Sequence, residues 1–412
     1  MVDKLCGVDR EKGQHVRARE ARVIVIGAGV GGLALAHGLR RGGVEVAVFD
    51  RDPSSDLRMQ GYRIHIDRDG NTALAECLPA DVLDLLQRTS GRSGDRVAGY
   101  DHQLRELFAQ TFPPTGDEIT NVDRLTLRRG LLTGLDDVVH FDRTFTRYEE
   151  LPSGRVRAVF ADGTDAVGDL IVGADGVRSA VRRQFLPHSD VADLGVRCLY
   201  GRMPITDETR DLVPADIARG FSLVTDGSGY GAGLAPVHFR ERPAGAHDYV
   251  MTVLIATTDR LGVPDETLFG MTGPQLHDLT TGAVQGWHPT IRSIFAHTDP
   301  GSFFPITIRA GRRVEPWEPG NVTLLGDAIH AMPPAGGVGA NTALWDAALL
   351  TREITRGDRA LREAVATYER QMLPHGFDTV DASVHQLGRM FGTATVEESL
   401  RLATARHTDA PT

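Results

Sequence analysis

A glycine-rich segment between two short apolar runs constrains this chain more than any other feature of its sequence. Residues 22–26 read as a buried strand, residues 30–41 as a helix, and residues 44–49 as a second strand. The turn from Gly27 to Gly32 joins the first strand to the helix and satisfies the pattern G-x-G-x-x-G. This order is typical of a βαβ unit that binds a dinucleotide at the start of its helix.

Three glycines in this turn are needed for different physical reasons. Gly27 permits the tight turn, Gly29 lets backbone N–H groups approach a pyrophosphate, and Gly32 lets the helix pack closely on the strand. Asp50 ends the second strand, where a carboxylate accepts hydrogen bonds from an adenosine ribose. The motif predicts a dinucleotide site, but it does not separate FAD from NAD.

The composition narrows the class of protein further. With 412 residues, 41% hydrophobic and 24% charged, the chain can form two or three domain-sized units. Its formal net charge of -10 would repel phosphate backbones and anionic lipid, so we expect no nucleic acid and no membrane among its partners. Cys6, Cys77 and Cys198 form no C-x-x-C pair, which favours a reducing cytoplasm.

One apolar run imitates a targeting signal. Residues 23–39 carry no Asp, Glu, Lys or Arg, but the run contains the glycines that a dinucleotide fold demands. No other run approaches the ~20 apolar residues that a membrane-spanning helix requires. We therefore expect neither a signal peptide nor a membrane span.

Two later segments also place glycine after an apolar run. Residues 169–173 read as a strand that leads to Asp175 and a following glycine, a pair that by itself is most often a turn. Residues 322–325 read as another strand, and a glycine and Asp327 follow it at the start of a glycine-rich stretch. That stretch opens a helix that runs through residue 354, so it is suited to holding a polar ligand group.

In this order, the GxGxxG, Asp-Gly and Gly-Asp segments resemble those of the para-hydroxybenzoate-hydroxylase-like flavoprotein monooxygenases. The match runs from about residue 22 to residue 350. The resemblance implies that Asp327 contacts the ribityl chain of FAD and that Asp175 lies near the pyrophosphate. The family's R-x-x-L-x-x-x-L segment, whose arginine approaches the FAD, matches Arg124, Leu127 and Leu131.

The helix that opens after the Gly-Asp segment has an implied role as well. Its N–H groups would face the N1–C2=O edge of the flavin, so Gly337, Gly339 and Asn341 are candidates for cofactor binding. Pro334 would border the flavin C4a position. His330 is either a proton-transfer group or a helix-flanking side chain that bonds the backbone, and both readings stay open.

Two arginines are further candidates for cofactor binding, and we expect no metal site. Arg51 and Arg63 are placed to meet cofactor phosphates, but a solvated surface position is an equal alternative. No group of residues has the spacing of a metal site, and we assign no catalytic side chain because the flavin itself carries oxygen transfer in the family that the chain resembles.

The fold implied is α/β, with a Rossmann-like FAD-binding domain of the glutathione-reductase type, an inserted, mainly antiparallel sheet domain and C-terminal helices. Alternating segments at 221–225 and 249–255 favour strands with one covered face, whereas 91–99 reads as a loop. We expect the substrate pocket between the flavin and the inserted sheet. The expected boundaries are 20–76, 105–188 and 311–356 for the FAD-binding domain, 77–104 and 189–310 for the substrate domain, and 357–405 for the C-terminal helices.

The implied activity is that of a single-component monooxygenase. NADPH or NADH would reduce the FAD, and O2 would then form a C4a-hydroperoxyflavin that hydroxylates or epoxidises an aromatic, polyketide, alkaloid or terpenoid molecule. A reductase or desaturase of the same fold, and a flavin-binding protein without turnover that shelters a labile intermediate, stay open as alternatives. We expect a monomer or a homodimer.

Overall fold

The computed structural model describes residues 16–54, 62–113, 116 and 118–391, and a five-stranded parallel sheet lies at its centre. The strand order is β17-β11-β1-β2-β7, and every neighbouring pair is parallel. Parallel sheets are buried on both faces, which explains why four of the five β1 residues are buried Val and Ile. The strands are β1 (Arg22–Ile26), β2 (Glu45–Phe49), β7 (Val139–His140), β11 (Leu170–Gly173) and β17 (Val322–Leu324).

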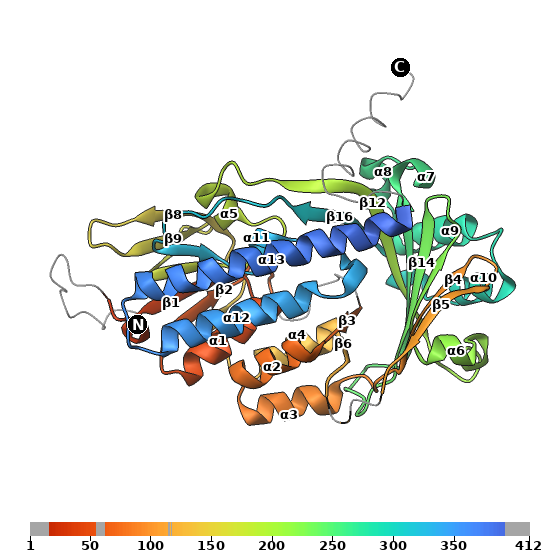
Figure 1. Cartoon of the computed structure of the whole chain (residues 1–412), viewed down its shortest axis with the longest axis horizontal. Coiled ribbons are helices and arrows are strands. Elements are labelled where there is room, and N and C mark those ends of the chain that lie inside the picture. Colours follow the sequence, from red (N-terminus) through yellow and green to blue (C-terminus); the bar gives the residue numbers. More distant parts are fainter. Residues whose placement is uncertain (1–15, 55–61, 114–115, 117, 392–412) are drawn as a thin grey trace, which may run out of the picture.

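Helices pack beside this sheet and beside one another. α1 (Val30–Arg41) joins β1 to β2 and lies along α12 (Gly339–Thr355), while α2 (Arg68–Cys77) contacts both helices (Figure 1). Leu33, Leu35 and Leu39 of α1 are fully buried, as the apolar spacing predicts. The predicted strand–helix–strand unit is thus confirmed.

Shorter elements surround the parallel sheet. The predicted hairpin around residues 156–163 is present, because β8, β9 and β10 form a three-stranded antiparallel sheet. β3 and β6 form a separate antiparallel pair. These elements and their neighbours are β3 (Arg63–His65), α3 (Ala80–Thr89), β6 (Asn121–Asp123), α4 (Arg124–Leu132), β8 (Phe145–Glu150), β9 (Val156–Phe160), β10 (Asp165–Gly168) and α5 (Ala180–Phe185).

A seven-stranded sheet forms the other end of the molecule (Figure 1). All its neighbours are antiparallel except β13 and β4, which confirms a mainly antiparallel insertion. In spatial order its strands are β16 (Phe304–Gly311), β12 (Val191–Pro204), β15 (Tyr249–Thr257), β14 (Tyr230–Val237), β13 (Gly220–Thr225), β4 (Arg96–Asp101) and β5 (Glu106–Thr111).

The two faces of this sheet belong to different hydrophobic cores. Alternate residues of β15 point to opposite faces, so Val250 and Leu254 join the core formed with the helices of the insertion. Tyr249, Met251 and Val253 join the core shared with the nucleotide-binding side. The insertion helices are α6 (Ala215–Ala218), α7 (Thr258–Leu261), α8 (Asp265–Gly270), α9 (Gly273–Ala283) and α10 (Pro289–Ala296).

Parts of the insertion differ from the expectation. Residues 91–99, predicted as a loop, include the first residues of β4, whose parallel partner β13 is far away in the sequence. The helices between residues 258 and 296 were not predicted. β5 pairs with β4, so a domain boundary after residue 104 divides this hairpin. The domain boundaries as a whole stay a prediction.

The C-terminal region is dominated by one helix. α13 (Leu361–Phe391) continues through Pro374, and it runs from the parallel sheet towards the seven-stranded sheet (Figure 1). Residues 392–405 of the predicted C-terminal helices lie outside the described residues. No helix in the described ranges is long and apolar enough to cross a lipid bilayer.

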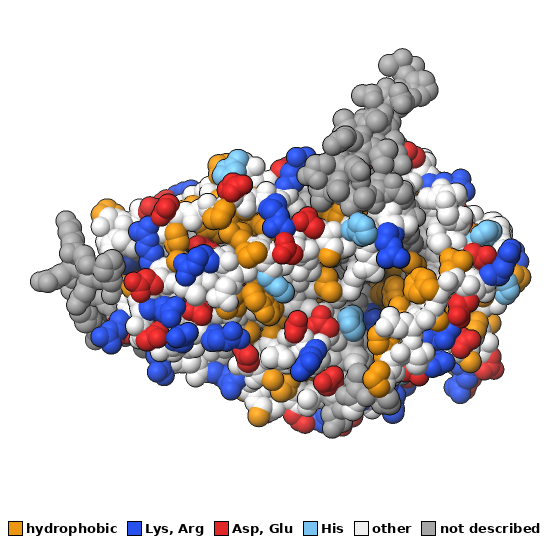
Figure 2. All heavy atoms as spheres, in the orientation of Figure 1, with side chains coloured by type: hydrophobic (Ala, Val, Ile, Leu, Met, Phe, Trp, Pro, Cys, Tyr) orange, Lys and Arg blue, Asp and Glu red, His pale blue; other side chains and the backbone are white. Residues whose placement is uncertain are grey.

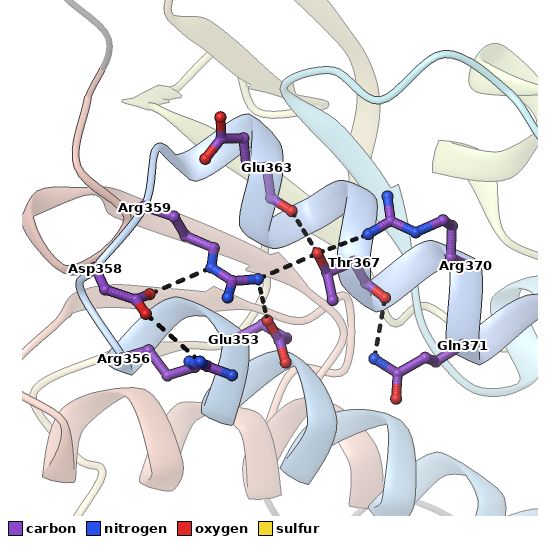
Figure 3. Close-up of polar contacts among 8 residues, drawn as sticks. All are labelled: Glu353, Arg356, Asp358, Arg359, Glu363, Thr367, Arg370 and Gln371. Carbon is purple, nitrogen blue, oxygen red and sulfur yellow. Dashed lines mark hydrogen bonds and ion pairs between the residues drawn. The ribbon is translucent and has the colours of Figure 1, made fainter.

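Polar side chains fix the corner between α12 and α13 (Figure 3). The Arg359 guanidinium donates to the buried carboxylate of Glu353 at 3.0 Å and to Thr367 Oγ1 at 3.2 Å. Its Nε also donates to Asp358 at 3.2 Å. Because Glu353 belongs to α12 and Thr367 to α13, this arginine sets the angle at which α13 leaves α12.

Charged side chains of both signs are interspersed on the face of the molecule that Figure 2 presents. On this face the acidic side chains therefore do not form a single acidic field.

Candidate functional site

The β1–α1 loop and the Asp-Gly segment lie against each other at the carboxyl ends of β1 and β11. Gly27 has φ +114°, and a Cβ there would overlap the carbonyl oxygen of Ala174 and lie 2.9 Å from Asp175 Cα. A Cβ on Gly32 would overlap the carbonyl oxygen of Gly27. The first two motifs therefore meet through backbone contacts that only glycine allows.

Asp50 holds this loop from the end of β2. The side chain is only 2% exposed; its Oδ2 accepts from the Ala28 N–H at 2.5 Å and its Oδ1 from the Asp52 N–H at 2.8 Å. Arg128 of α4 reaches the same place, where it lies 3.0 Å from Asp52 Oδ2 and 4.0 Å from Asp50 Oδ1. Arg51 is exposed. Asp50 thus stands beside the loop as predicted, and its contact with a ribose stays a prediction.

Only one of the two carboxylate oxygens of Asp175 accepts hydrogen bonds from described residues. Oδ2 accepts from the Ala180 N–H at 2.6 Å and from the Val181 N–H at 3.3 Å. Oδ1 is buried and has no hydrogen-bond partner among the described residues. Burial raises the pKa of Asp175, whereas Ser179 and the nearby N–H groups lower it. An open, buried acceptor beside Gly27 is suited to a ligand hydroxyl.

The Gly-Asp segment forms α11 (Asp327–His330), and we call the position of its aspartate, open to solvent yet surrounded by protein, the recess. The Asp327 side chain is exposed, yet enough protein surrounds it for desolvation to raise its pKa, against the opposing effects of His330 and Arg124. A Cβ on Gly339 would lie 4.0 Å from Asp327 Oδ1. The structure therefore brings Arg124, Asp327 and the start of α12 together.

His330 points away from this recess into the protein. Its Nε2 lies 2.6 Å from Asp346 Oδ2, which also accepts from the Gly326 N–H at 2.8 Å, and both side chains are fully buried. Burial alone would lower the pKa of His330, but Asp346, Asp327 and a backbone hydrogen bond together raise it above its ordinary value. A Cβ on Gly376 of α13 would overlap Cδ2 of the imidazole ring. These contacts support a role for His330 in holding α11, α12 and α13 together.

The first turn of α12 presents backbone N–H groups. A 3-10 turn at Pro334–Gly336 and the left-handed Gly337, at φ +66°, precede the helix. The first intrahelical bond there runs from the Thr342 N–H to the Val338 carbonyl at 2.9 Å. The N–H groups of residues 339–341 therefore lack intrahelical partners. Pro334 itself is exposed.

The Asn341 side chain connects two segments of the protein. Its Oδ1 accepts from the Asp67 N–H at 3.1 Å, and its Nδ2 donates to the carbonyls of His65 at 3.0 Å and Gly337 at 3.2 Å. The amide thus ties the start of α12 to the segment between β3 and α2. Its backbone N–H is the group left for a ligand.

Aromatic rings line the interface between this recess and the seven-stranded sheet. The Tyr62 ring centroid lies 5.4 Å from Phe304 and 6.1 Å from Tyr249, and Tyr200 stacks on Phe304 at 5.8 Å. Burial raises the pKa of Tyr200, and the positive charge of Arg124 acts in the opposite direction. Arg124 therefore lies close enough to both Tyr200 and Asp327 for its charge to act on each of them.

The site fits an FAD molecule. The glycine loop is closed to any Cβ, Asp175 has an open acceptor, and Asp327 is accessible beside the first turn of α12. In the described residues, no three His, Cys, Asp or Glu side chains gather closely enough to hold a metal ion.

Comparison with known proteins agrees with this arrangement. A family model described as an FAD binding domain matches residues 278–383, and one described as an NAD(P)-binding Rossmann-like domain matches residues 25–77. A solved structure from Photorhabdus luminescens subsp. laumondii, assigned as an FAD-containing monooxygenase, is 32% identical with a TM-score of 0.79. The match covers 90% of this chain and 99% of that one. The chain belongs to the FAD-dependent monooxygenases.

Longer relatives contain this monooxygenase unit as one part. The dual O-methyltransferase/FAD-dependent monooxygenase elcB of Phaeosphaeria nodorum is 32% identical over 91% of this chain and 46% of its own length. The chloroplastic zeaxanthin epoxidase of Nicotiana plumbaginifolia is 29% identical over 84% of this chain and 50% of its own length. The chain spans about half the length of these relatives.

The sequence did not reveal every residue of this monooxygenase site. Arg128 repeats the position of Arg124 one helical turn later, and that spacing was an available signal. Tyr62, Tyr200 and Phe304 come from separate strands of two sheets, so only the fold brings them together.

Proposed function

We propose that the protein is a single-component FAD-dependent monooxygenase that uses NADPH or NADH and O2 to hydroxylate a small organic molecule. Epoxidation is the second outcome of the same oxygen transfer, and it is favoured by the relative named zeaxanthin epoxidase. One observation carries the proposal: Asp327 is accessible beside the first turn of α12, close to Arg124, whose charge also acts on Tyr200 of the inserted sheet.

The residues at the carboxyl ends of β1, β2 and β11 would hold the dinucleotide part of FAD. The N–H groups that follow Gly29 at the start of α1 suit the pyrophosphate, while Asp50 and Arg51 would meet the adenosine part. Asp175 would accept from a hydroxyl through its open Oδ1.

The residues of α11 and α12 would hold the ribityl chain and the flavin ring of FAD. Asp327 suits the ribityl hydroxyls, and the N–H groups of Gly339 and Asn341 suit the flavin edge on which negative charge gathers. Gly337 lets the chain enter the helix at positive φ, and Pro334 would border the reactive face. When bound, FAD accepts reducing equivalents from NAD(P)H and activates O2 for transfer.

The chain contributes three things to that reaction. The first turn of α12 stabilises negative charge with its N–H groups and helix dipole. Tyr62, Tyr200 and Phe304 offer apolar ring surface that excludes water from the reacting groups. Arg124 places a cation between the recess and the sheet.

The proposal is tested in two steps. The purified protein should show flavin absorbance, or gain it on incubation with FAD. With candidate aromatic, polyketide, alkaloid and terpenoid substrates, NAD(P)H oxidation should accelerate, and the product should carry label from 18-O2. Substrate reduced or desaturated without label would favour the reductase or desaturase alternative, and bound FAD without any NAD(P)H oxidation would favour the non-turnover protein.

The compartment and the assembly state belong to the same proposal. Cys77 and Cys198 are free and buried, which is compatible with a reducing cytoplasm. We propose a monomer or homodimer, which light scattering after size-exclusion chromatography distinguishes.

A further inference from the structure

Arg63 is a half-buried cation without a protein anion. Its guanidinium makes no hydrogen bond or ion pair with any residue that the structure describes, and its Nε is shielded from solvent. Burial lowers the pKa of Arg63 to about 10, although the nearby Tyr249 acts to raise it. Arg182 and Arg197 show the usual arrangement, since carbonyls hold the first and Asp193 and Asp265 hold the second.

Arg63 lies between the start of α12 and the seven-stranded sheet. Residues two apart on a strand share a face, so Arg63 points to the same side of β3 as His65. A Cβ on Gly337 would lie 3.3 Å from His65 Cβ, which places this face beside the predicted flavin end of the site. Tyr249 of β15 is close to Arg63 on the side of the sheet.

The carboxylate opposite Arg63 accepts hydrogen bonds from other residues. Asp123 is its cross-strand partner in the β3–β6 pair. However, Asp123 Oδ1 accepts from Thr126 N at 2.9 Å, and Oδ2 accepts from Tyr249 Oη at 3.0 Å. A second cation, Arg202 of β12, lies 5.4 Å from the Tyr62 ring centroid. Asp123 keeps its negative charge, but its two oxygens are directed to Thr126 and Tyr249, so Arg63 is left without a hydrogen-bond acceptor among the described residues.

A guanidinium whose shielded Nε–H has no acceptor costs folding free energy, and binding of an anion offsets that cost. The anion has two possible sources, FAD and the substrate. The expected phosphate position is the β1–α1 loop, at the end of the parallel sheet, whereas Arg63 lies among Tyr62, Tyr249 and the other rings of the interface. Aromatic rings around a cation suit a flat, negatively charged organic molecule.

We infer that Arg63 determines substrate specificity by binding an anionic group of an aromatic substrate, a carboxylate or an ionised phenol, at the interface of β3 and β15. This inference rests on the proposed function, because it concerns the substrate of the same site. Arg63 is the anchor, and the rings of Tyr62, Tyr200 and Phe304 hold the flat part of the molecule.

The test compares acids with their neutral esters. Benzoate, salicylate and 2-naphthoate, each beside its methyl ester, are titrated into the FAD-loaded protein by equilibrium dialysis and by the change in flavin absorbance. We expect at least one acid to bind about tenfold more tightly than its ester, since a charge-assisted hydrogen bond is worth that much. Arg63→Gln should remove this preference, Arg63→Lys should keep part of it, and both should leave FAD affinity unchanged.

A matched control is Arg105→Gln, whose side chain is 80% exposed beside Asp101 and should leave every dissociation constant unchanged. The inference is wrong if the wild type shows no preference for any acid, or if Arg63→Gln weakens FAD binding and keeps the preference, in which case the cofactor supplies the anion. If Arg63→Gln fails to fold, Arg63→Lys is used in its place, and a preference for acids as strong as in the wild type would contradict the inference. Arg63-dependent binding of acid without NAD(P)H oxidation supports the subsite and contradicts the proposed monooxygenase activity.

Discussion

Single residues of the site differ in whether backbone geometry or side-chain chemistry fixes their identity. Gly27 and Gly32 are fixed by geometry, because any Cβ would overlap a carbonyl oxygen. Asp175 and Asp327 are fixed by chemistry, because each offers an acceptor at a site closed on several sides by protein. The glycines are therefore tested by adding a Cβ, and the aspartates by removing the carboxylate.

Gly27→Ala should abolish FAD binding and destabilise the fold. The new Cβ would overlap Ala174 and sit at φ +114°, which costs on the order of 2 kcal/mol or more. Flavin retention on desalting and the midpoint of urea unfolding measure the two effects. Gly154→Ala is the matched control: it also has positive φ, at +77°, but nothing lies within 4 Å of its Cβ. Equal FAD loss in both variants would contradict the role of the collision.

Asp327→Ala should weaken FAD binding about tenfold or more, because a ligand hydroxyl would lose a charged acceptor. Stability should change little, since the side chain is exposed. Fluorescence titration of the apoprotein with FAD gives the dissociation constant. Asp278→Ala removes a carboxylate that is 86% exposed on α9 and should have no effect. Unchanged FAD affinity in Asp327→Ala would show that the Gly-Asp motif is misplaced.

Among whole elements, β1 and α1 could be bounded from the sequence, whereas β4 could not. An apolar run, a glycine turn and the helical spacing of leucines are local signals, so the chain itself marks where β1 ends and α1 begins. β4 has its parallel partner β13 more than a hundred residues away, and no local signal shows that pairing. α9 did carry a local signal, the Thr272–Gln275 capping box, which the sequence interpretation missed.

The helix α13 is attached to β17 by a buried carboxyl group. Tyr368 Oη donates to the Leu324 carbonyl at 2.8 Å, and Glu369 accepts from Trp317 Nε1 at 2.9 Å and Thr323 Oγ1 at 2.8 Å. Burial raises the pKa of Glu369 to about 7 from its ordinary value of 4.5, although Trp317 and Thr323 lower it. The folded state therefore holds this proton more tightly than the unfolded state does.

Stability should consequently fall as pH rises from about 4.5 to about 7, the window between the unfolded and folded pKa values of Glu369. The contribution of Glu369 is about 3 kcal/mol at most. Glu369→Gln keeps an acceptor for Trp317 and Thr323 without titrating, so it should flatten this part of the profile. Urea unfolding at a series of pH values measures it. Glu363→Gln, in the first turn of the same helix, is the control, and an unchanged profile in Glu369→Gln would contradict the assignment.

For the whole molecule, the interface between the two large sheets matters most. Each sheet could be anticipated from its own pattern, parallel and apolar in one case and alternating in the other. Their relative placement could not, because it depends on contacts between β3, β6 and β15 that no single segment encodes. The residues of the interface were accordingly missed, although their general location was expected.

Tyr249→Phe tests the connection across that interface. It removes the hydrogen bond from Tyr249 Oη to Asp123 Oδ2, which should cost about 1 kcal/mol of folding free energy. FAD binding should change less than twofold, because Tyr249 lies on the sheet side. Denaturant unfolding with and without FAD measures both quantities. Tyr100→Phe on β4 is the control, since its hydroxyl has no hydrogen-bond partner in the described part of the chain and its loss should not destabilise. A larger loss of stability in Tyr100→Phe would contradict this account.

The alternation of β15 has a consequence for how such a protein changes over time. Val250 and Leu254 support the helices of the insertion, while Tyr249, Met251 and Val253 on the opposite face meet the nucleotide-binding side. Substitutions on one face leave the packing of the other intact, since successive side chains point in opposite directions. Ligand preference can therefore diversify by replacement of every second residue while the rest of the strand preserves the scaffold, both in evolving lineages and in libraries built on this strand.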